Sequence, residues 1–217
     1  MVIDSLILGA YETNCYVLRK ESPGLRRSEA ARDCLVVDPG LDAGPLIDFL
    51  QSRTLSPAAV VLTHGHIDHI AGLAALREAF AEIKVYIHNL DAKMLTDPYT
   101  NLSMMGGMPF STEPADVALN EPDTIEQAGV KLQVLHTPGH TPGGISLYAP
   151  DDGMAFVGDT LFAGSIGRTD FPGGSMAELL RSVREKLFTL PGDTQAYPGH
   201  GPATTIAQEK AHNPFFQ

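Results

Sequence analysis

Residues 64–69, HGHIDH, constrain this chain more than any other stretch, because they place three imidazoles and a carboxylate within six positions. A short apolar run with β-forming residues precedes them, and residues 70–80, which follow, have helical spacing and good helix formers. The potential ligands therefore lie on a turn between a strand and a helix. Imidazole suits Zn, Fe, Ni or Cu, and carboxylates extend the choice toward Mn. The turn predicts a metal centre, with ordinary hydrogen-bonded histidines as the alternative.

Three later stretches repeat this placement of a potential ligand at the end of an apolar run. One run ends in HTPGHTPGG, which contains His140; the next ends at Asp159; and a third precedes His200. Loops held by a rigid scaffold commonly carry function, so we expect these side chains to gather at one edge of a sheet. Each has an ordinary interpretation as a turn or loop residue, but their joint placement favours a site.

In type and order these residues resemble those of the metallo-β-lactamase fold superfamily, and the resemblance extends over most of the chain. It implies an α/β fold, an αββα sandwich of two packed mixed β-sheets flanked by helices. It also implies one or two zinc ions, with iron and manganese as alternatives. The ligands would be His64, His66 and His140 for one metal, Asp68, His69 and His200 for the second, and Asp159 as the bridge between them.

Two neighbouring cations can share a water-derived hydroxide and lower its pKa. We therefore expect catalytic roles for Asp68, which would bind metal and hold the hydroxide, and for Asp159, whose two oxygens suit a bridge. His136 either orients its loop or is a packed structural histidine. His88 and His212 are expected to be surface or capping groups without a role in the site.

The pattern of apolar residues and turn formers predicts the remaining elements. Expected strands cover residues 2–8, 15–18, 34–37, 58–62, 84–87, 130–135, 145–149, 154–158 and 194–197, and expected helices cover 43–51, 70–80, 89–95 and 175–187. Residues 96–116 have no period and are expected to form a long loop, which is uncommon unless functional. Its methionines, Met104, Met105 and Met108, either line a substrate mouth or fill apolar surface.

Composition favours one domain spanning residues 1–217, since 43% hydrophobic content can bury a core. The net charge of −11 argues against nucleic acid as a partner. Two cysteines without a CxxC motif favour a reducing compartment, and the opening residues resemble neither a signal peptide nor a membrane span, so we expect a cytoplasmic location and no membrane association. Arg26, Arg27 and Arg32 are mixed with acids and are interpreted as part of a solvated loop.

The best local indication of the reaction is GRTDFPGG, residues 167–174. Arg168 lies between glycines, and its guanidinium suits a carboxylate; the alternative is a salt bridge to Asp170. Together with HTPGHTPGG, this stretch resembles the short bacterial glyoxalase II-like hydrolases, which implies that Arg168 contacts the glutathione part of a substrate. Longer glyoxalase II enzymes add a C-terminal helical domain. The present chain ends 17 residues after His200, so we expect that domain to be absent, with residues 213–216 closing part of the pocket.

The leading hypothesis is a metallohydrolase that cleaves a small glutathione-derived thioester, S-lactoylglutathione, to lactate and glutathione. Metal charge would stabilise the oxyanion and no protein nucleophile would be needed. A glutathione persulfide dioxygenase is a rival, with one Fe(II) on His64, His140 and Asp159. A lactonase is another rival, because hydroxide attacks a carbonyl there too. A metal-binding protein without catalysis is the non-enzymatic alternative.

Overall fold

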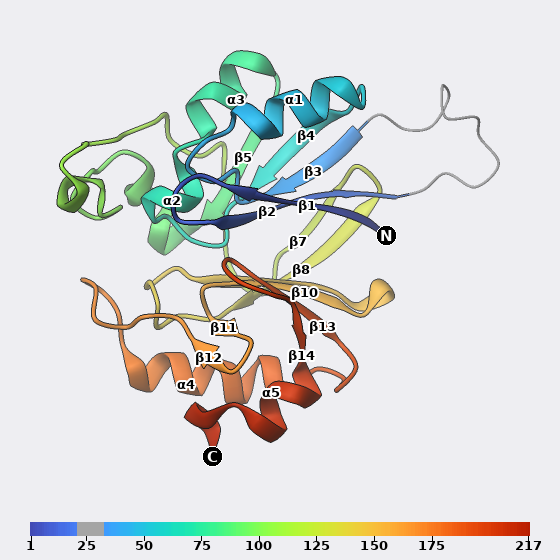
Figure 1. The fold of residues 1–217 in the computed structure, drawn as a ribbon, viewed down its shortest axis with the longest axis vertical. Helices are drawn as coiled ribbons and strands as arrows, with labels where there is room; N and C mark the ends of the chain where they lie inside the picture. The colour runs from blue at the N-terminus through green and yellow to red at the C-terminus, as the bar shows by residue number, and fades with distance from the viewer. Residues whose placement is uncertain (21–32) are drawn as a thin grey trace.

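The computed structural model describes residues 1–20 and 33–217, and two six-stranded sheets form its centre (Figure 1). The first sheet has the order β1 (Val2–Leu8), β2 (Thr13–Arg19), β3 (Asp33–Val37), β4 (Ser56–Val61), β5 (Lys84–His88) and β6 (Val117–Leu119). The second has the order β14 (Thr204–Thr205), β13 (Gln195–Pro198), β10 (Met154–Gly158), β9 (Ile145–Ala149), β8 (Val130–His136) and β7 (Thr124–Gln127). A short hairpin, β11 (Leu161–Phe162) and β12 (Ser165–Ile166), follows β10.

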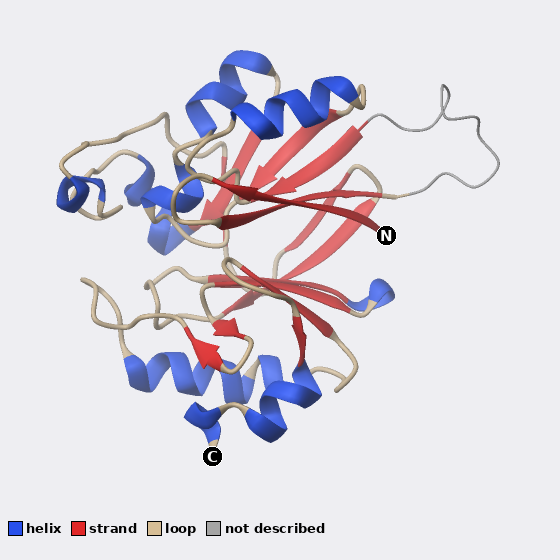
Figure 2. Cartoon of the chain, viewed as in Figure 1, coloured by secondary structure: helices blue, strands red, loops and turns tan. Residues whose placement is uncertain are grey.

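Helices cover the outer face of each sheet, so the predicted αββα sandwich is confirmed (Figure 2). Helices α1 (Gly44–Ser52) and α3 (Leu73–Ala79) pack on the first sheet, and α4 (Met176–Glu185) and α5 (Ile206–His212) pack on the second. Within the described chain, no helix is both long and apolar enough to cross a bilayer.

Alternation along single strands builds these layers, because successive side chains of a strand point to opposite faces. In β3, Val36 packs into the cluster beneath α1 and α3, whereas Leu35 and Val37 pack between the two sheets. Val60 and Val61 of β4 divide in the same way. Both faces of these central strands are buried, which explains why the sequence there is continuously apolar.

Parallel pairing brings the functional loops to one edge. Strands β3, β4, β5 and β6 are mutually parallel, and β10 is parallel to β13. In such sheets ligands bind beyond the carboxyl ends of the strands. The HGHIDH turn follows β4, Asp159 follows β10 and His200 follows β13, so all three arrive at this edge.

The helix predicted over residues 70–80 is wrong in its boundaries. A short helix, α2 (Ile67–Ile70), begins inside the HGHIDH turn, and α3 starts only at Leu73. Gly72 separates them: its N–H donates to the Gly40 carbonyl at 2.8 Å, and a Cβ there would lie 2.6 Å from the Pro39 carbonyl oxygen. Tertiary contact with the turn after β3 interrupts a helix that local propensity alone would continue.

The other differences concern short elements. The short helix predicted over residues 89–95 is present with those bounds as a 3-10 helix, η1 (Asn89–Leu95), and the long loop contains a second one that was not predicted, η2 (Ser103–Gly106). Buried Asn101 holds this loop by donating to the carbonyls of Met94 and Phe110 and accepting from Ser103 N. The sequence analysis missed β6, β7, β11, β12, β14 and α5. The arginines at 26, 27 and 32 lie outside the described residues.

Candidate metal centre

Five histidines and two aspartates lie together at the edge where the two sheets meet. The first sheet supplies His64, His66, Asp68 and His69, and the second supplies His140, Asp159 and His200. Three groups have their donor atoms within 4.8 Å of one another: His64, His66 and His140; Asp68, His69 and His200; and His64, His69 and Asp159. The structure therefore brings together all seven ligands predicted from the sequence.

The first group is tight and buried. His66 Nδ1 lies 2.9 Å from His140 Nε2, and the rings of His64 and His140 meet edge to face at 4.8 Å between centroids. All three side chains are nearly inaccessible to solvent. Donor atoms that share one tetrahedral cation at about 2.0–2.2 Å lie roughly 3–3.6 Å apart, so the group has the spacing of a metal site.

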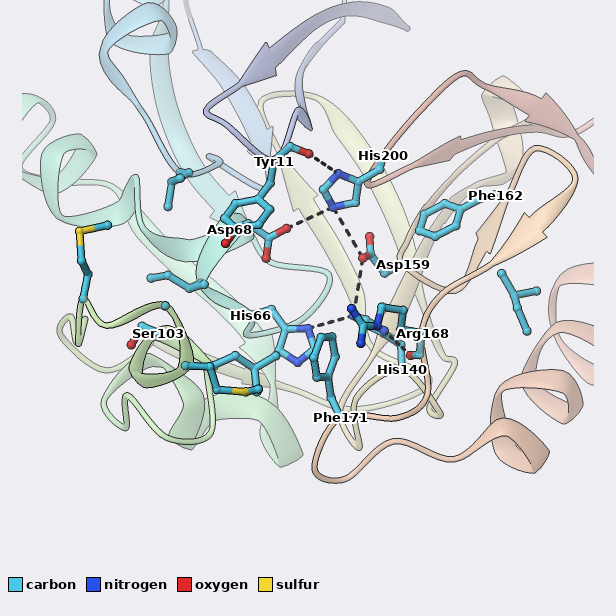
Figure 3. Close-up of a pocket in the computed structure, with 17 residues that line it drawn as sticks. Tyr11, His66, Asp68, Ser103, His140, Asp159, Phe162, Arg168, Phe171 and His200 are labelled. Atoms are coloured by element: carbon cyan, nitrogen blue, oxygen red, sulfur yellow. Dashed lines mark hydrogen bonds and ion pairs between the residues drawn. The ribbon is translucent and has the colours of Figure 1, made fainter.

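The second group lies directly beside it and is more open (Figure 3). His200 Nε2 is 3.1 Å from Asp68 Oδ2 and 3.4 Å from His69 Nε2. Asp159 joins the two groups, since its Oδ1 lies 3.5 Å from His69 Nε2 and its Oδ2 lies 3.6 Å from His140 Nε2. Gly199 makes this approach possible, because a Cβ there would lie 2.2 Å from Asp159 Oδ1.

Hydrogen bonds on the far side of four of the five rings fix which nitrogen faces the centre. Asp38, which the sequence analysis did not single out as a site residue, accepts from His69 Nδ1 at 2.9 Å and from the Thr63 hydroxyl at 2.7 Å. That hydroxyl has given its only hydrogen to Asp38, so toward His64 Nδ1, 3.2 Å away, it accepts. Both rings then direct Nε2 at the centre, and Nε2 is the nitrogen that would bind a metal.

Backbone carbonyls orient two more rings, those of His140 and His200, in the same sense. His140 Nδ1 donates to the Arg168 carbonyl at 2.7 Å, and His200 Nδ1 donates to the Tyr11 carbonyl at 3.0 Å. The His200 loop is itself tied to the first sheet, since Asn14 donates from its backbone to Gly199 and from its side chain to Pro198 and Gly201. Contacts between the sheets thus set the distance between the two halves of the centre.

Burial and charge act differently on the histidines. Burial, with a contribution from neighbouring rings, keeps the pKa of His64 well below its usual range, and burial with His140 lowers the pKa of His66 to about 3. Burial also lowers the pKa of His69, but the charges of Asp68, Asp38 and Asp159 outweigh it and raise that pKa to about 10. Burial raises the pKa of Asp68, yet His69 and His200 bring it below its ordinary value. His64 and His66 are therefore neutral, whereas the three carboxylates stabilise the charged form of His69, whose Nε2 proton a metal would have to displace.

Two buried atoms of the cluster have no hydrogen-bond partner among the described residues: His64 Nε2 and Asp159 Oδ1. An unpaired buried lone pair is costly, and buried polar atoms are normally satisfied. Both atoms point into the cluster, and a cation there would satisfy both. Imidazole and carboxylate donors suit first-row divalent ions. The residues present therefore fit the one or two metal ions that the sequence predicts.

A cavity of about 530 Å³ opens beside the cluster (Figure 3). His66, Asp68, His140, Asp159 and His200 form its polar floor. The walls come from the loops after β1 and β3, the start of α2, the η2 loop and the β11–β12 hairpin with its following loop. Their side chains include Tyr11, Leu41, Ile67, Leu102, Met105, Met108, Phe162, Ile166 and Phe171. The prediction that the methionines line a mouth is thus right for Met105 and Met108, while Met104 does not line the cavity.

Arg168 lies on the wall of this cavity, in the arrangement given as its alternative. Its Nε and Nη2 donate to the two oxygens of Asp170 at 3.0 and 2.8 Å, and its guanidinium lies 4.3 Å from the Phe171 ring centroid. A role in binding glutathione remains a prediction.

The other singled-out residues lie away from the cluster. His88 is buried, not at the surface, and its ring stacks on His136 at 4.3 Å; it does cap η1, as the capping alternative predicted, by accepting from Leu90 N. His136 donates to the Pro142 carbonyl and so braces the loop of His140. The expectation that residues 213–216 close the pocket is wrong: Phe216 packs on Phe188, beside α4.

This cluster and its fold match one known protein family. The model of the metallo-β-lactamase superfamily matches residues 8–200, which include every residue of the cluster. The chain belongs to this superfamily. It is 37% identical to the probable metallo-hydrolase YqgX of Bacillus subtilis, over 96% of this chain and 94% of that protein. It is 34% identical to the hydroxyacylglutathione hydrolase GloC of Haemophilus influenzae, over 99% and 98% of the two chains.

Solved structures of the superfamily superpose over nearly the whole chain. The BLEG-1 B3 metallo-β-lactamase matches with a TM-score of 0.92 at 40% identity, covering all of both chains. TTHA1623 in a di-iron-bound form matches with a TM-score of 0.82 at 34% identity, over 98% and 99% of the chains. ETHE1 from Myxococcus xanthus matches with a TM-score of 0.77 at 30% identity, over 99% of this chain and 84% of that one.

Proposed function

We propose that this protein is a metal-dependent thioester hydrolase of the hydroxyacylglutathione hydrolase type, with S-lactoylglutathione as substrate. The observation that carries the proposal is the complete double donor set, bridged by Asp159, at the floor of an open cavity. The likeness to GloC over almost the entire chain supports the choice of a thioester. When bound, a pair of cations would lower the pKa of a water between them and stabilise negative charge on the attacked carbonyl oxygen.

The chain's own residues would then act in distinct ways. His64, His66 and His140 would hold the first cation, Asp68, His69 and His200 the second, and Asp159 both. Asp68 is the more exposed carboxylate of the cluster, and its side chain faces the cavity. It is therefore placed to accept a hydrogen bond from the nucleophilic oxygen and to orient it toward the substrate.

The reaction consumes one water. A new C–O bond forms at the carbonyl carbon, the C–S bond breaks, and the sulfur leaves with the electron pair as a thiolate. Thiols are acidic enough to leave without prior protonation. The proton released from the water ends on the thiolate or in solvent, giving a carboxylate and a free thiol. No side-chain nucleophile is required, and neither Cys15 nor Cys34 reaches the cavity, since both are fully buried in the core under α1 and α3.

The test is the loss of thioester absorbance of S-lactoylglutathione, with protein loaded separately with Zn, Mn and Fe(II). Metal-dependent decay is expected, with loss of at least about a hundredfold in Asp68→Ala, since a positioned group of this kind contributes 10²–10⁴-fold. Asp42→Ala is the matched control, because Asp42 is exposed and bonds only the backbone of Gly44. Zinc content measured on each variant separates lost binding from lost chemistry. Absence of decay with every metal would reject the proposal.

The likeness to ETHE1 and to a di-iron protein gives a second candidate. A glutathione persulfide dioxygenase would use a single Fe(II) on His64, His140 and Asp159, with open positions for oxygen and sulfur. The same samples decide between the two reactions. Oxygen uptake with glutathione persulfide by the iron form, without thioester cleavage by the zinc form, would favour the dioxygenase.

A further inference from the structure

The wall of the cavity beside the metal cluster is largely apolar, and a lactoyl group is too small and too polar to cover it. Outside the cluster, its side chains are aliphatic, thioether or aromatic apart from Ser103 and Arg168. Leu41 and Ile67 lie on the wall from the first sheet, and Phe162 and Ile166 come from the β11–β12 hairpin. A cavity of about 530 Å³ is within the range of drug-sized ligand sites.

The two methionines at the mouth are unusually exposed. Met105 is 72% and Met108 77% accessible, and Tyr11, which also lines the cavity, is 60% accessible. Apolar side chains that gather around a polar centre mark a binding surface rather than ordinary scattered exposure. Methionine is flexible and polarisable, and it adapts to apolar ligands of irregular shape. The segment that bears them is nevertheless fixed, since Phe110 N donates to Ser103 Oγ and Asn101 anchors the loop from below.

The charge of the wall points the same way. Arg168 is its only basic side chain among the described residues, apart from the histidines of the cluster, and its Nε and Nη2 already pair with Asp170. A carboxylate on the acyl arm would therefore meet a guanidinium whose charge Asp170 already balances. It would also approach a protein of net charge −11. An uncharged arm avoids this repulsion and gives up little attraction.

From these observations we infer that the preferred substrate carries an uncharged, apolar acyl group substantially larger than lactoyl, bound by Met105 and Met108. The inference rests on the proposed thioester hydrolysis and names its acyl specificity. The metal cluster would hold the thioester carbonyl, and the aliphatic or aromatic remainder of the acyl group would extend beneath the two methionines. Water displaced from this apolar wall supplies the binding free energy.

Binding without chemistry tests this directly. S-hexylglutathione and S-methylglutathione are thioethers that cannot be hydrolysed, and they differ only in the apolar arm. By calorimetry on the metal-loaded protein, the hexyl compound is expected to bind at least about tenfold more tightly, since each fully buried methylene contributes about fourfold. Its binding should also show a more negative heat-capacity change. Equal affinities would overturn the inference.

Variants at the methionines test whether these residues cause the preference for S-hexylglutathione. Met105→Ser with Met108→Ser should remove most of the difference between the two thioethers while leaving S-methylglutathione affinity unchanged. Met104→Ser is the matched control: Met104 belongs to the same run but does not line the cavity, so the difference should persist. A double variant that keeps the full hexyl preference would also refute the assignment to these methionines.

Turnover separates this inference from the proposed function. Among lactoyl-, hexanoyl- and adipoyl-glutathione, kcat/KM is expected to be highest for hexanoyl, and the terminal carboxylate of adipoyl should cancel the gain. Cleavage of lactoyl-glutathione with no advantage for hexanoyl would leave the proposed function standing and overturn the inference. Cleavage of none of the three would reject the proposed function and, with it, the inference about its acyl group.

Discussion

Asp38→Asn exchanges one carboxylate oxygen for an amide nitrogen at a buried position where three donors converge. Asp38 is 1% exposed; Oδ1 accepts from Thr63 N at 2.8 Å, and Oδ2 accepts from the Thr63 hydroxyl and from His69 Nδ1. An asparagine supplies one acceptor oxygen and one donor group. Whichever way the amide is oriented, a donor must face a donor.

Each orientation has a definite cost. With the amide nitrogen at the Oδ1 position, Thr63 N is left unpaired, which costs about 1–3 kcal/mol of folding free energy. With the nitrogen at the Oδ2 position, a His69 ring that binds metal through Nε2 keeps its proton on Nδ1, where it would face the amide N–H donor. That mismatch weakens metal binding, and the same 1–3 kcal/mol then corresponds to roughly 5- to 150-fold.

Competition for zinc against a chelator of known affinity measures the second cost, and denaturant unfolding of the metal-free protein measures the first. Asp38→Asn should lose affinity, stability or both by the amounts above. Asp42→Asn, four positions further and exposed, should lose neither. Unchanged zinc affinity together with an unchanged unfolding free energy in Asp38→Asn would refute the argument that Asp38 sets the tautomer of His69.

Three further outcomes are expected. Gly139→Ala should cost at least about 3 kcal/mol of folding free energy, because φ is +128° and the new Cβ would lie 2.2 Å from Leu179 N. Gly153→Ala is the control: at φ +63° with open space around it, it should cost only the left-handed strain of about 1–2 kcal/mol. Equal losses of unfolding free energy in denaturant would contradict this. Burial, helped by the His136 charge, lowers the pKa of His88 to about 4, so the metal-free protein should lose stability as pH falls from about 6.5 to 4 while the unfolded chain takes up the proton. His88→Asn, which keeps a capping acceptor, should flatten that loss by about 1–3 kcal/mol relative to the exposed control His212→Asn, and parallel stability curves would count against it. Chelation should lower Tm by about 5–10 °C relative to protein with zinc at a hundred times its Kd, as scanning calorimetry would record; an unchanged Tm would mean that the cluster binds no metal in the folded state.

The clustering of the seven candidate ligands was predictable because the segments that carry them follow apolar strands. A strand such as β4 is identified by its composition, and the residue after it has one place to go, the carboxyl edge of the sheet. Asp38 obeys the same rule, since it follows Leu35–Val36–Val37, but the Asp-Pro-Gly sequence favoured a turn. Both interpretations hold: Asp38 has φ +52°, within a turn, and that conformation aims its carboxylate at Thr63 and His69.

What the sequence could not predict depends on contacts between distant segments. The break between α2 and α3 is set by the backbone of Pro39 and Gly40, not by helix propensity. Strands such as β11 and β14 have two residues each, too short for any period to be recognised. Phe216 packs beside α4, against an apolar cluster that includes Phe188. No local sequence pattern at the end of the chain indicates this contact.

Chemistry and specificity therefore reside in different parts of this molecule. The candidate metal donors lie at strand ends from both sheets, and hydrogen bonds hold them there, such as that of Asp38 to His69 within the first sheet and that of Asn14 to Pro198 between the sheets. The methionines of the cavity wall lie on the η2 loop, whereas the loop after the β11–β12 hairpin also orients the cluster, because the Arg168 carbonyl accepts from His140 Nδ1. Changes at Met105 or Met108 can alter the acyl arm without moving a ligand, whereas a change at Asp38 disturbs the centre without touching the substrate. A substrate preference that followed Asp38 rather than the methionines would contradict this division.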